Sequence, residues 1–102
     1  MSTIYTEAEI KSRLAGFPGW ALGDDGQLHA TFTFKNFART LLFVNAVAHL
    51  AEAFDHHPDL FIYSYRNLRI SLMSHDVKGV TDRDFRLIAA ISALPLGQPA
   101  QP

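Results

Sequence analysis

Cysteine is absent from the 102-residue chain, which excludes disulfide bonds and thiolate-based metal sites. An excess of either charge is also missing, since nine Lys and Arg residues face ten Asp and Glu residues for a net charge of −1. This balance argues against nucleic acid and anionic membranes as main partners. No apolar stretch approaches the length of a membrane span, and the N-terminal residues lack the basic and apolar regions of a signal peptide. We therefore expect a soluble, cytoplasmic protein.

Length and composition are those of one folded domain over residues 1–102. Hydrophobic residues make up 48% of the chain and charged residues 19%, as in ordinary globular proteins. A chain this short buries a modest core, so association with copies of itself is a reasonable expectation. Residues 96–102 are expected to form a frayed tail.

Helix and strand signals alternate along the chain. N-cap residues or capping pairs mark three helix starts: Thr6 with Glu9, Asn36, and Thr81 with Asp84. Apolar and polar residues alternate in the strand segments, as the spacing of Leu28, Ala30, Phe32 and Phe34 shows. The expected elements are a helix (7–15), strands (20–22, 27–34), a helix (37–54), strands (60–65, 68–74) and a helix (about 82–94). Turns are expected at 23–26 and at Arg66-Asn67.

The order α-β-β-α-β-β-α predicts an α+β fold. Two hairpins join into one four-stranded antiparallel sheet, and helices pack on its apolar face. In the last strand, Leu68, Ile70 and Leu72 belong to the apolar face. The opposite face holds Arg69, Ser71 and Met73, with His75 following at the same parity. This polar face is left for solvent, a ligand or another subunit.

The most unusual stretch is Asp55-His56-His57-Pro58, with His75 following the last strand. The proline closes the long helix, because the residue before a proline is pushed out of the α region. Asn45, His49, Glu52 and His56 are spaced by three or four residues. On a helix they form one polar stripe, in which Glu52 and His56 are i,i+4 neighbours. Such a stripe on an otherwise apolar helix indicates a wet cleft.

Other residues of the same types have simpler interpretations. His29 and His49 are expected to be solvated or hydrogen-bonded in place. Thr31, Thr33 and Ser71 are expected as polar residues of the strands rather than as nucleophiles. The aromatic side chains expected in the core are Phe32, Phe34, Phe37, Phe43 and Phe54.

The segment Glu52–Asp59, with its Asp-His-His-Pro run, precedes His75, Gly79, Thr81 and the pair Arg83-Asp84. These residues, at these distances, resemble the pterin-4a-carbinolamine dehydratase family. The resemblance also covers Gly19-Trp20 and the run from Phe32 to Phe37, and it extends from the first helix to about Ala93. It implies the fold of that family, whose element order is similar to the one expected above.

The resemblance also implies an activity. Members dehydrate 4a-hydroxytetrahydropterin, the product left by aromatic amino acid hydroxylases, to the quinonoid dihydropterin, in tetrahydrobiopterin-type cofactor recycling. The pterin is the substrate, the family needs no metal, and no further cofactor is expected. Members form dimers or tetramers, so a homodimer or homotetramer is expected here. Some members are also dimerisation cofactors of a homeodomain transcription factor.

Loss of water from the carbinolamine needs two proton transfers. The C4a hydroxyl must gain a proton to leave as water, and the neighbouring N5–H must lose one. Imidazole suits both steps, because its unperturbed pKa is about 6.5. We expect His56 and His75 to carry out these transfers, while His57 positions the ring or provides another proton route.

The remaining residues of the motif are expected to support these histidines. Glu52, Asp55 and Pro58 would bind substrate together with His57, with Glu52 either holding an imidazole tautomer or accepting hydrogen bonds from the amino-pyrimidine edge. Arg83 and Asp84 would tie the helix ends together behind the site. A purely structural role for this last pair stays open, because acidic residues stabilise helix starts.

Two other classes of function stay open on sequence grounds. The same fold can serve as a protein-interaction module, which the broad apolar surface of the helix 37–54 fits. A small metal-binding protein is also conceivable, because three histidines with Glu52 could supply zinc ligands. The intact set of three histidines and Glu52 favours an enzyme over a scaffold.

Overall fold

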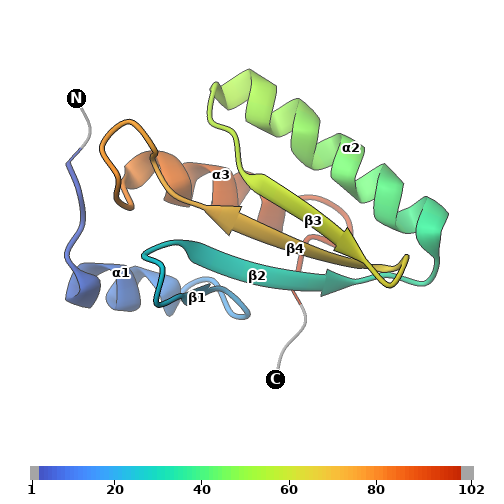
Figure 1. Cartoon of the computed structure of the whole chain (residues 1–102), viewed down its shortest axis with the longest axis horizontal. Coiled ribbons are helices and arrows are strands. Elements are labelled where there is room, and N and C mark those ends of the chain that lie inside the picture. Colours follow the sequence, from blue (N-terminus) through green and yellow to red (C-terminus); the bar gives the residue numbers. More distant parts are fainter. Residues whose placement is uncertain (1–2, 100–102) are drawn as a thin grey trace.

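The computed structural model describes residues 3–99, which form three helices and one four-stranded antiparallel sheet (Figure 1). The elements are α1 (Glu7–Leu14), β1 (Ala21–Leu22), β2 (Leu28–Thr33), α2 (Phe37–Phe54), β3 (Asp59–Tyr63), β4 (Asn67–Leu72) and α3 (Asp82–Ser92). The expected element order is confirmed, with each boundary within three residues of its expected place. The strand order in the sheet is β1-β2-β4-β3, so the central strands β2 and β4 come from different hairpins.

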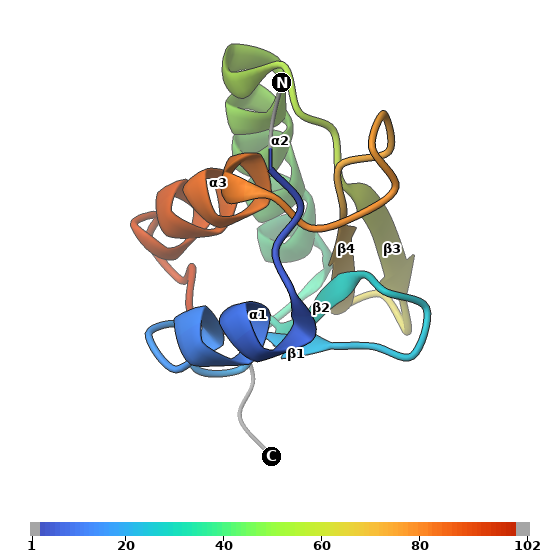
Figure 2. The same ribbon diagram turned by 90° about the vertical axis from the view of Figure 1, so that its left-hand side faces the viewer.

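One face of the sheet holds the core. The register places Ala30 opposite Ile70 and Phe32 opposite Leu68, and all four side chains are buried. Figure 2 shows the helices on the same side of the sheet, where α2 and α3 cover this apolar face. The alternation in β2 and β4 therefore predicts correctly which side chains lie beneath the helices.

All three helix starts are capped as expected. Thr6 with Glu9 and Thr81 with Asp84 each form a complete capping box, in which each side chain bonds to the other residue's backbone. The Asn36 side chain accepts a hydrogen bond from the backbone N–H of Arg39. The carboxylate of Asp84, which caps α3, also belongs to the functional site described below.

The turn between β3 and β4 lies earlier than expected. Ser64 and Tyr65 both adopt left-handed backbone angles, with φ of 48° and 55°. Asn67, expected in the turn, instead begins β4 and pairs with Tyr63. No glycine marks this turn, so composition alone places it too late.

The helix α2 buries only one narrow side. Thr40, Phe43, Val47 and Ala51 are buried, whereas Phe37, Leu42 and Phe54 are 49%, 65% and 43% exposed. The expectation that Phe37 and Phe54 lie in the core is therefore wrong. By length and composition alone α2 could cross a membrane, contrary to the sequence-based expectation, but core helices of soluble proteins meet the same criterion.

The C-terminal segment turns back toward α3. Gly97 donates its backbone N–H to the carbonyl of Leu94, and the Gln98 side chain donates to the carbonyl of Ser92 at 3.1 Å. Of the expected frayed tail, Gly97 and Gln98 therefore have contacts with the domain. Residues 100–102 lie outside the described part of the chain.

Candidate functional site

The two consecutive histidines that follow α2, His56 and His57, point in different directions. Asp55 takes the left-handed conformation (φ 50°, ψ 46°), and the backbone N–H of His56 returns to the carbonyl of Ala51 at 3.0 Å. This is the pattern of a helix C-terminus closed by a left-handed residue. His56 therefore leaves the helix and turns inward, while His57 stays at the surface. The expected stripe ends at Glu52, because the helix is over before His56.

His56 is bound to an acidic residue inside the protein. Its side chain is only 7% exposed, and Nε2 lies 2.6 Å from Oδ1 of Asp84, which is fully buried. The other oxygen of Asp84, Oδ2, accepts hydrogen bonds from Ser74 Oγ and from the backbone N–H of Thr81, both at 2.9 Å. This carboxylate therefore caps α3 and orients an imidazole at the same time.

His57 has a carboxylate partner of its own at the surface. Its Nε2 lies 2.5 Å from Oε2 of Glu52, and the two side chains are 59% and 77% exposed. Glu52 thus orients His57 rather than His56. Asp55 is exposed between them, and Pro58 is half-buried just before β3. Both imidazoles therefore have Nε2 fixed by a carboxylate, one inside the protein and one outside.

His75 lies in the loop that follows β4. Ser74 and Gly79 close this loop by exchanging backbone hydrogen bonds of 2.9 and 3.3 Å. The pairing of Asp59 with Ser71 in the sheet brings the chain before β3, which carries His57, beside the chain after β4, which leads to His75. Both histidines are exposed, and the register places the two chain segments that carry them side by side.

Arg83 fastens the same loop to α3. Its Nη2 donates to Oδ1 of Asp76 at 2.7 Å, and this hydrogen bond holds the pKa of the Asp76 carboxyl below its usual value. Arg83 and Asp84 are adjacent but act on different partners. The arginine holds the loop that carries His75, and the aspartate holds His56.

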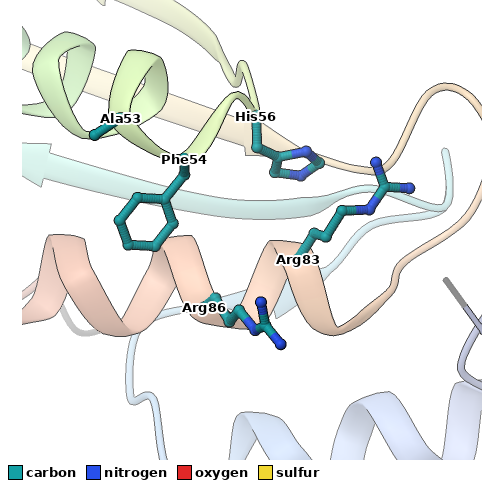
Figure 3. Close-up of a pocket in the computed structure, with 5 residues that line it drawn as sticks. All are labelled: Ala53, Phe54, His56, Arg83 and Arg86. Atoms are coloured by element: carbon teal, nitrogen blue, oxygen red, sulfur yellow. The ribbon is translucent and has the colours of Figure 1, made fainter. Parts of the chain in front are cut away.

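A pocket of about 330 Å³ opens beside His56, between the end of α2 and the start of α3. Ala53, Phe54, His56, Arg83 and Arg86 line it (Figure 3). Figure 3 shows the His56 ring directed toward the Arg83 side chain, with Phe54 lying over α3. The His56 imidazole is therefore buried on its Asp84 side and borders a pocket that is open to solvent.

Sequence reasoning missed Ser74, which is fully buried and bonded to both Asp84 and Thr81. A signal was available. Ser74 has the parity of Leu68, Ile70 and Leu72, so it is a polar residue at the end of the apolar face. A hydroxyl in that position needs a hydrogen-bond partner inside the protein.

Another histidine, His29, lies on the open face of the sheet. His29 Nδ1 lies 2.8 Å from Ser71 Oγ, and Nε2 lies 2.9 Å from Asp25 Oδ1. The His29 bond, followed by the backbone N–H of Gln27, holds the pKa of Asp25 below its usual value. His29 is thus hydrogen-bonded in place, as expected. Within residues 3–99, no group of three His, Asp or Glu side chains is arranged to hold a metal ion.

A family model described as pterin 4 alpha carbinolamine dehydratase matches residues 3–94 of the chain. Two bacterial relatives carry the provisional name pterin-4-alpha-carbinolamine dehydratase. The one from Chloroflexus aggregans is 45% identical over 89 residues, covering 87% of this chain and 94% of the relative. The one from Picosynechococcus is 40% identical over 94 residues, covering 92% of this chain and all of the relative.

Two solved structures have a similar fold. A transcriptional coactivator/pterin dehydratase from Brucella melitensis superposes with a TM-score of 0.79 at 31% identity, covering 83% of this chain and 90% of that one. A pterin dehydratase-like protein, described as a RuBisCO assembly factor in the alpha-carboxysome, gives a TM-score of 0.63 at 23% identity, covering 80% and 93%. At that identity the second likeness shows the fold alone.

Proposed function

The chain belongs to the pterin 4 alpha carbinolamine dehydratase family, and on that basis we propose that it dehydrates a 4a-hydroxytetrahydropterin to the quinonoid dihydropterin. In this reaction the C4a–O bond breaks and the hydroxyl leaves as water after gaining a proton. N5 loses its proton, and its electron pair forms the double bond to C4a. The atoms balance without an oxidant or reductant, so the proposed reaction uses no cofactor.

The observation that supports this proposal most is the pair of oriented imidazoles. Nε2 of His56 is bound to Asp84 and Nε2 of His57 to Glu52, at 2.6 and 2.5 Å. A base held by a third group is the usual arrangement for general acid–base catalysis. Within residues 3–99, Nδ1 of each ring has no hydrogen bond and is available for proton exchange.

We propose a role for each residue of the site. His56, which borders the pocket, and His75, on its loop, exchange protons with N5 and the C4a hydroxyl. His57 with Glu52 holds the pterin ring from the exposed side, and Asp55 and Pro58 shape the same edge. Arg83 and Asp84 hold the loop and the His56 ring. General acid–base assistance of this kind is worth about 10²–10⁴-fold in rate.

The test is a direct assay. Phenylalanine hydroxylase generates the 4a-carbinolamine in situ, and its ultraviolet decay is followed with and without this protein. The His56→Ala and His75→Ala variants should each lose most of the acceleration. His49→Ala is the matched control, because His49 is an exposed histidine of α2 outside the site and its loss should leave the rate unchanged. A folded wild-type protein that leaves the decay unchanged would contradict the proposal.

We also propose a second function, binding of protein through α2. The specific observation is the exposed apolar side of this helix, where Phe37, Leu41 and Leu42 are 49%, 37% and 65% exposed. The simplest occupant is a second copy of the chain in a cytoplasmic homodimer or homotetramer. Light scattering coupled to size exclusion measures the mass in solution, and a monomer at all concentrations would leave only a different protein as the partner.

A further inference from the structure

Four buried polar residues form one connected cluster beneath the site. It consists of His56, Ser74, Thr81 and Asp84, which are 6%, 0%, 0% and 0% exposed, and we refer to it as the Ser74 cluster. Its members come from the end of α2, the end of β4 and the start of α3. Three hydrogen bonds connect their side chains: Ser74–Thr81 at 2.8 Å, Ser74–Asp84 at 2.9 Å and His56–Asp84 at 2.6 Å.

The direction of each hydrogen bond follows from donor counting. Asp84 as a carboxylate only accepts, so the single Ser74 proton goes to Oδ2. The Thr81 hydroxyl must then donate to Ser74, and the Nε2 atom of His56 must carry the proton that it shares with Oδ1. Nδ1 of His56 has no hydrogen-bond partner within residues 3–99 and is not among the fully buried unpaired atoms. When the ring is neutral, it therefore presents a lone pair at Nδ1.

We propose that Ser74 is a positioning residue for His56. Its hydroxyl, together with the Thr81 N–H, fixes Oδ2 of Asp84, and this sets the direction in which Oδ1 meets the imidazole. Without the hydroxyl, the carboxylate keeps one donor on that side and can rotate. The ring then samples both tautomers, and Nδ1 loses its fixed lone pair. The effect on the reaction rate rests on the proposed function, whereas the effect on the tautomer does not.

Ser74 also contacts the structures that hold two histidines, His56 and His75. Its backbone exchanges hydrogen bonds with Gly79 and thereby closes the loop that carries His75. Its side chain acts on His56 through Asp84. A Ser74→Ala change removes the second contact and leaves the first, so it separates the positioning of His56 from the closing of the loop. Ser74→Thr restores a hydroxyl at the same place.

The decisive measurement is the tautomer of His56, read from nitrogen-15 imidazole shifts in histidine-labelled protein. The five histidine signals are assigned with single His→Gln variants. Wild type should show the Nε2–H form at His56, Ser74→Ala a mixture of forms, and Ser74→Thr a return to wild type. Ser71→Ala is the matched control, because Ser71 also bonds a histidine but lies on the other face of the sheet. It should alter the His29 signals and leave those of His56 unchanged.

Kinetics give the second readout. In Ser74→Ala we expect kcat to fall about 10-fold with KM nearly constant, a part of the about 10²–10⁴-fold that acid–base assistance supplies.

An unchanged His56 tautomer in Ser74→Ala, or a wild-type ring in the Nδ1–H form, overturns the proposal. If the tautomer shifts as expected but wild type lacks dehydratase activity, the positioning role stands and the proposed function fails. Should Ser74→Ala not fold, Ser74→Cys keeps the volume with a weaker donor and takes its place.

Discussion

Replacing Asp84 by asparagine changes one atom of the buried carboxylate and tests the arrangement around it. Asp84 accepts from the backbone N–H of Thr81, from Ser74 Oγ and from His56 Nε2. An amide has one acceptor oxygen, which must face the Thr81 N–H because that group can only donate. The amide NH₂ then faces His56. The ring can accept a hydrogen bond there only by moving its own proton to Nδ1, which removes the lone pair from the pocket side.

The magnitude can be worked out from these three hydrogen bonds. Bonds to a charged group contribute about 1.5–3 kcal/mol and those between neutral groups about 0.5–1.5 kcal/mol, so each loses about 1 kcal/mol. Three weakened bonds together lower the free energy of unfolding by about 3 kcal/mol, of the about 5–15 kcal/mol typical of a domain. The folded variant should lose up to about 10²–10⁴-fold in kcat, because His56 presents the wrong nitrogen.

Urea unfolding followed by circular dichroism measures the first effect, and the carbinolamine decay assay measures the second. Asp82→Asn is the control, because Asp82 lies in the same turn but pairs with Arg86 near the surface. An exposed pair of this kind contributes about 0–1 kcal/mol. The reasoning is refuted if Asp84→Asn lowers the free energy of unfolding by less than Asp82→Asn does and leaves both the His56 tautomer and kcat unchanged.

Three further changes test other parts of the structure. The hydrogen bond from His29 lowers the pKa of Asp25. The stability that this bond contributes is therefore present above the ordinary carboxyl pKa of 3.8 and is lost as the pH falls through the lowered pKa. Asp25→Asn should therefore flatten the acid side of the stability profile measured by thermal unfolding, and an unchanged profile would count against this bond. Glu52→Gln should slow dehydration, because His57 loses its carboxylate partner. It should change the free energy of unfolding by only about 0–1 kcal/mol, because the Glu52–His57 pair is exposed. A loss of stability as large as the loss of activity would indicate a structural role for Glu52. Leu42→Glu should shift any oligomer toward monomer in light scattering without lowering Tm, and a stable oligomer would place the interface elsewhere.

The fold could be predicted because its signals are local. The alternation in β2 and β4 and the three capping patterns each involve residues within a few positions of one another, and the structure confirms them. The sequence places the turn of Ser64 and Tyr65 too late, because left-handed backbone at non-glycine residues has no composition signal. Phe37 and Phe54 are exposed although the sequence predicts them in the core, because hydrophobicity alone does not show which side of an apolar helix is covered.

The partners within the site could not be predicted, because they depend on distant contacts and on one backbone angle. His56 and Asp84 are 28 positions apart, and no periodicity connects them. The left-handed backbone of Asp55 decides which of the two histidines meets the Glu52 carboxylate. That residue is His57. Ser74 carried a detectable signal, its polarity on an apolar face, but its partners depend on how α3 docks against β4.

The pairing of β2 with β4 also has a consequence for the order of folding. Thr33 pairs with Asn67 and Leu28 with Leu72, so the central strands meet only after the whole of α2 and β3 has been looped out between them. Pairing at such sequence separations is slow, because the entropy cost of closing the loop precedes the gain in contacts. The contacts at the junction of α2, β4 and α3 span fewer positions, 28 for His56–Asp84 and 10 for Ser74–Asp84. We therefore expect the pairing of β2 with β4, rather than the docking of this junction, to limit the folding rate. Changes in β2 should then slow folding more than changes at the junction do.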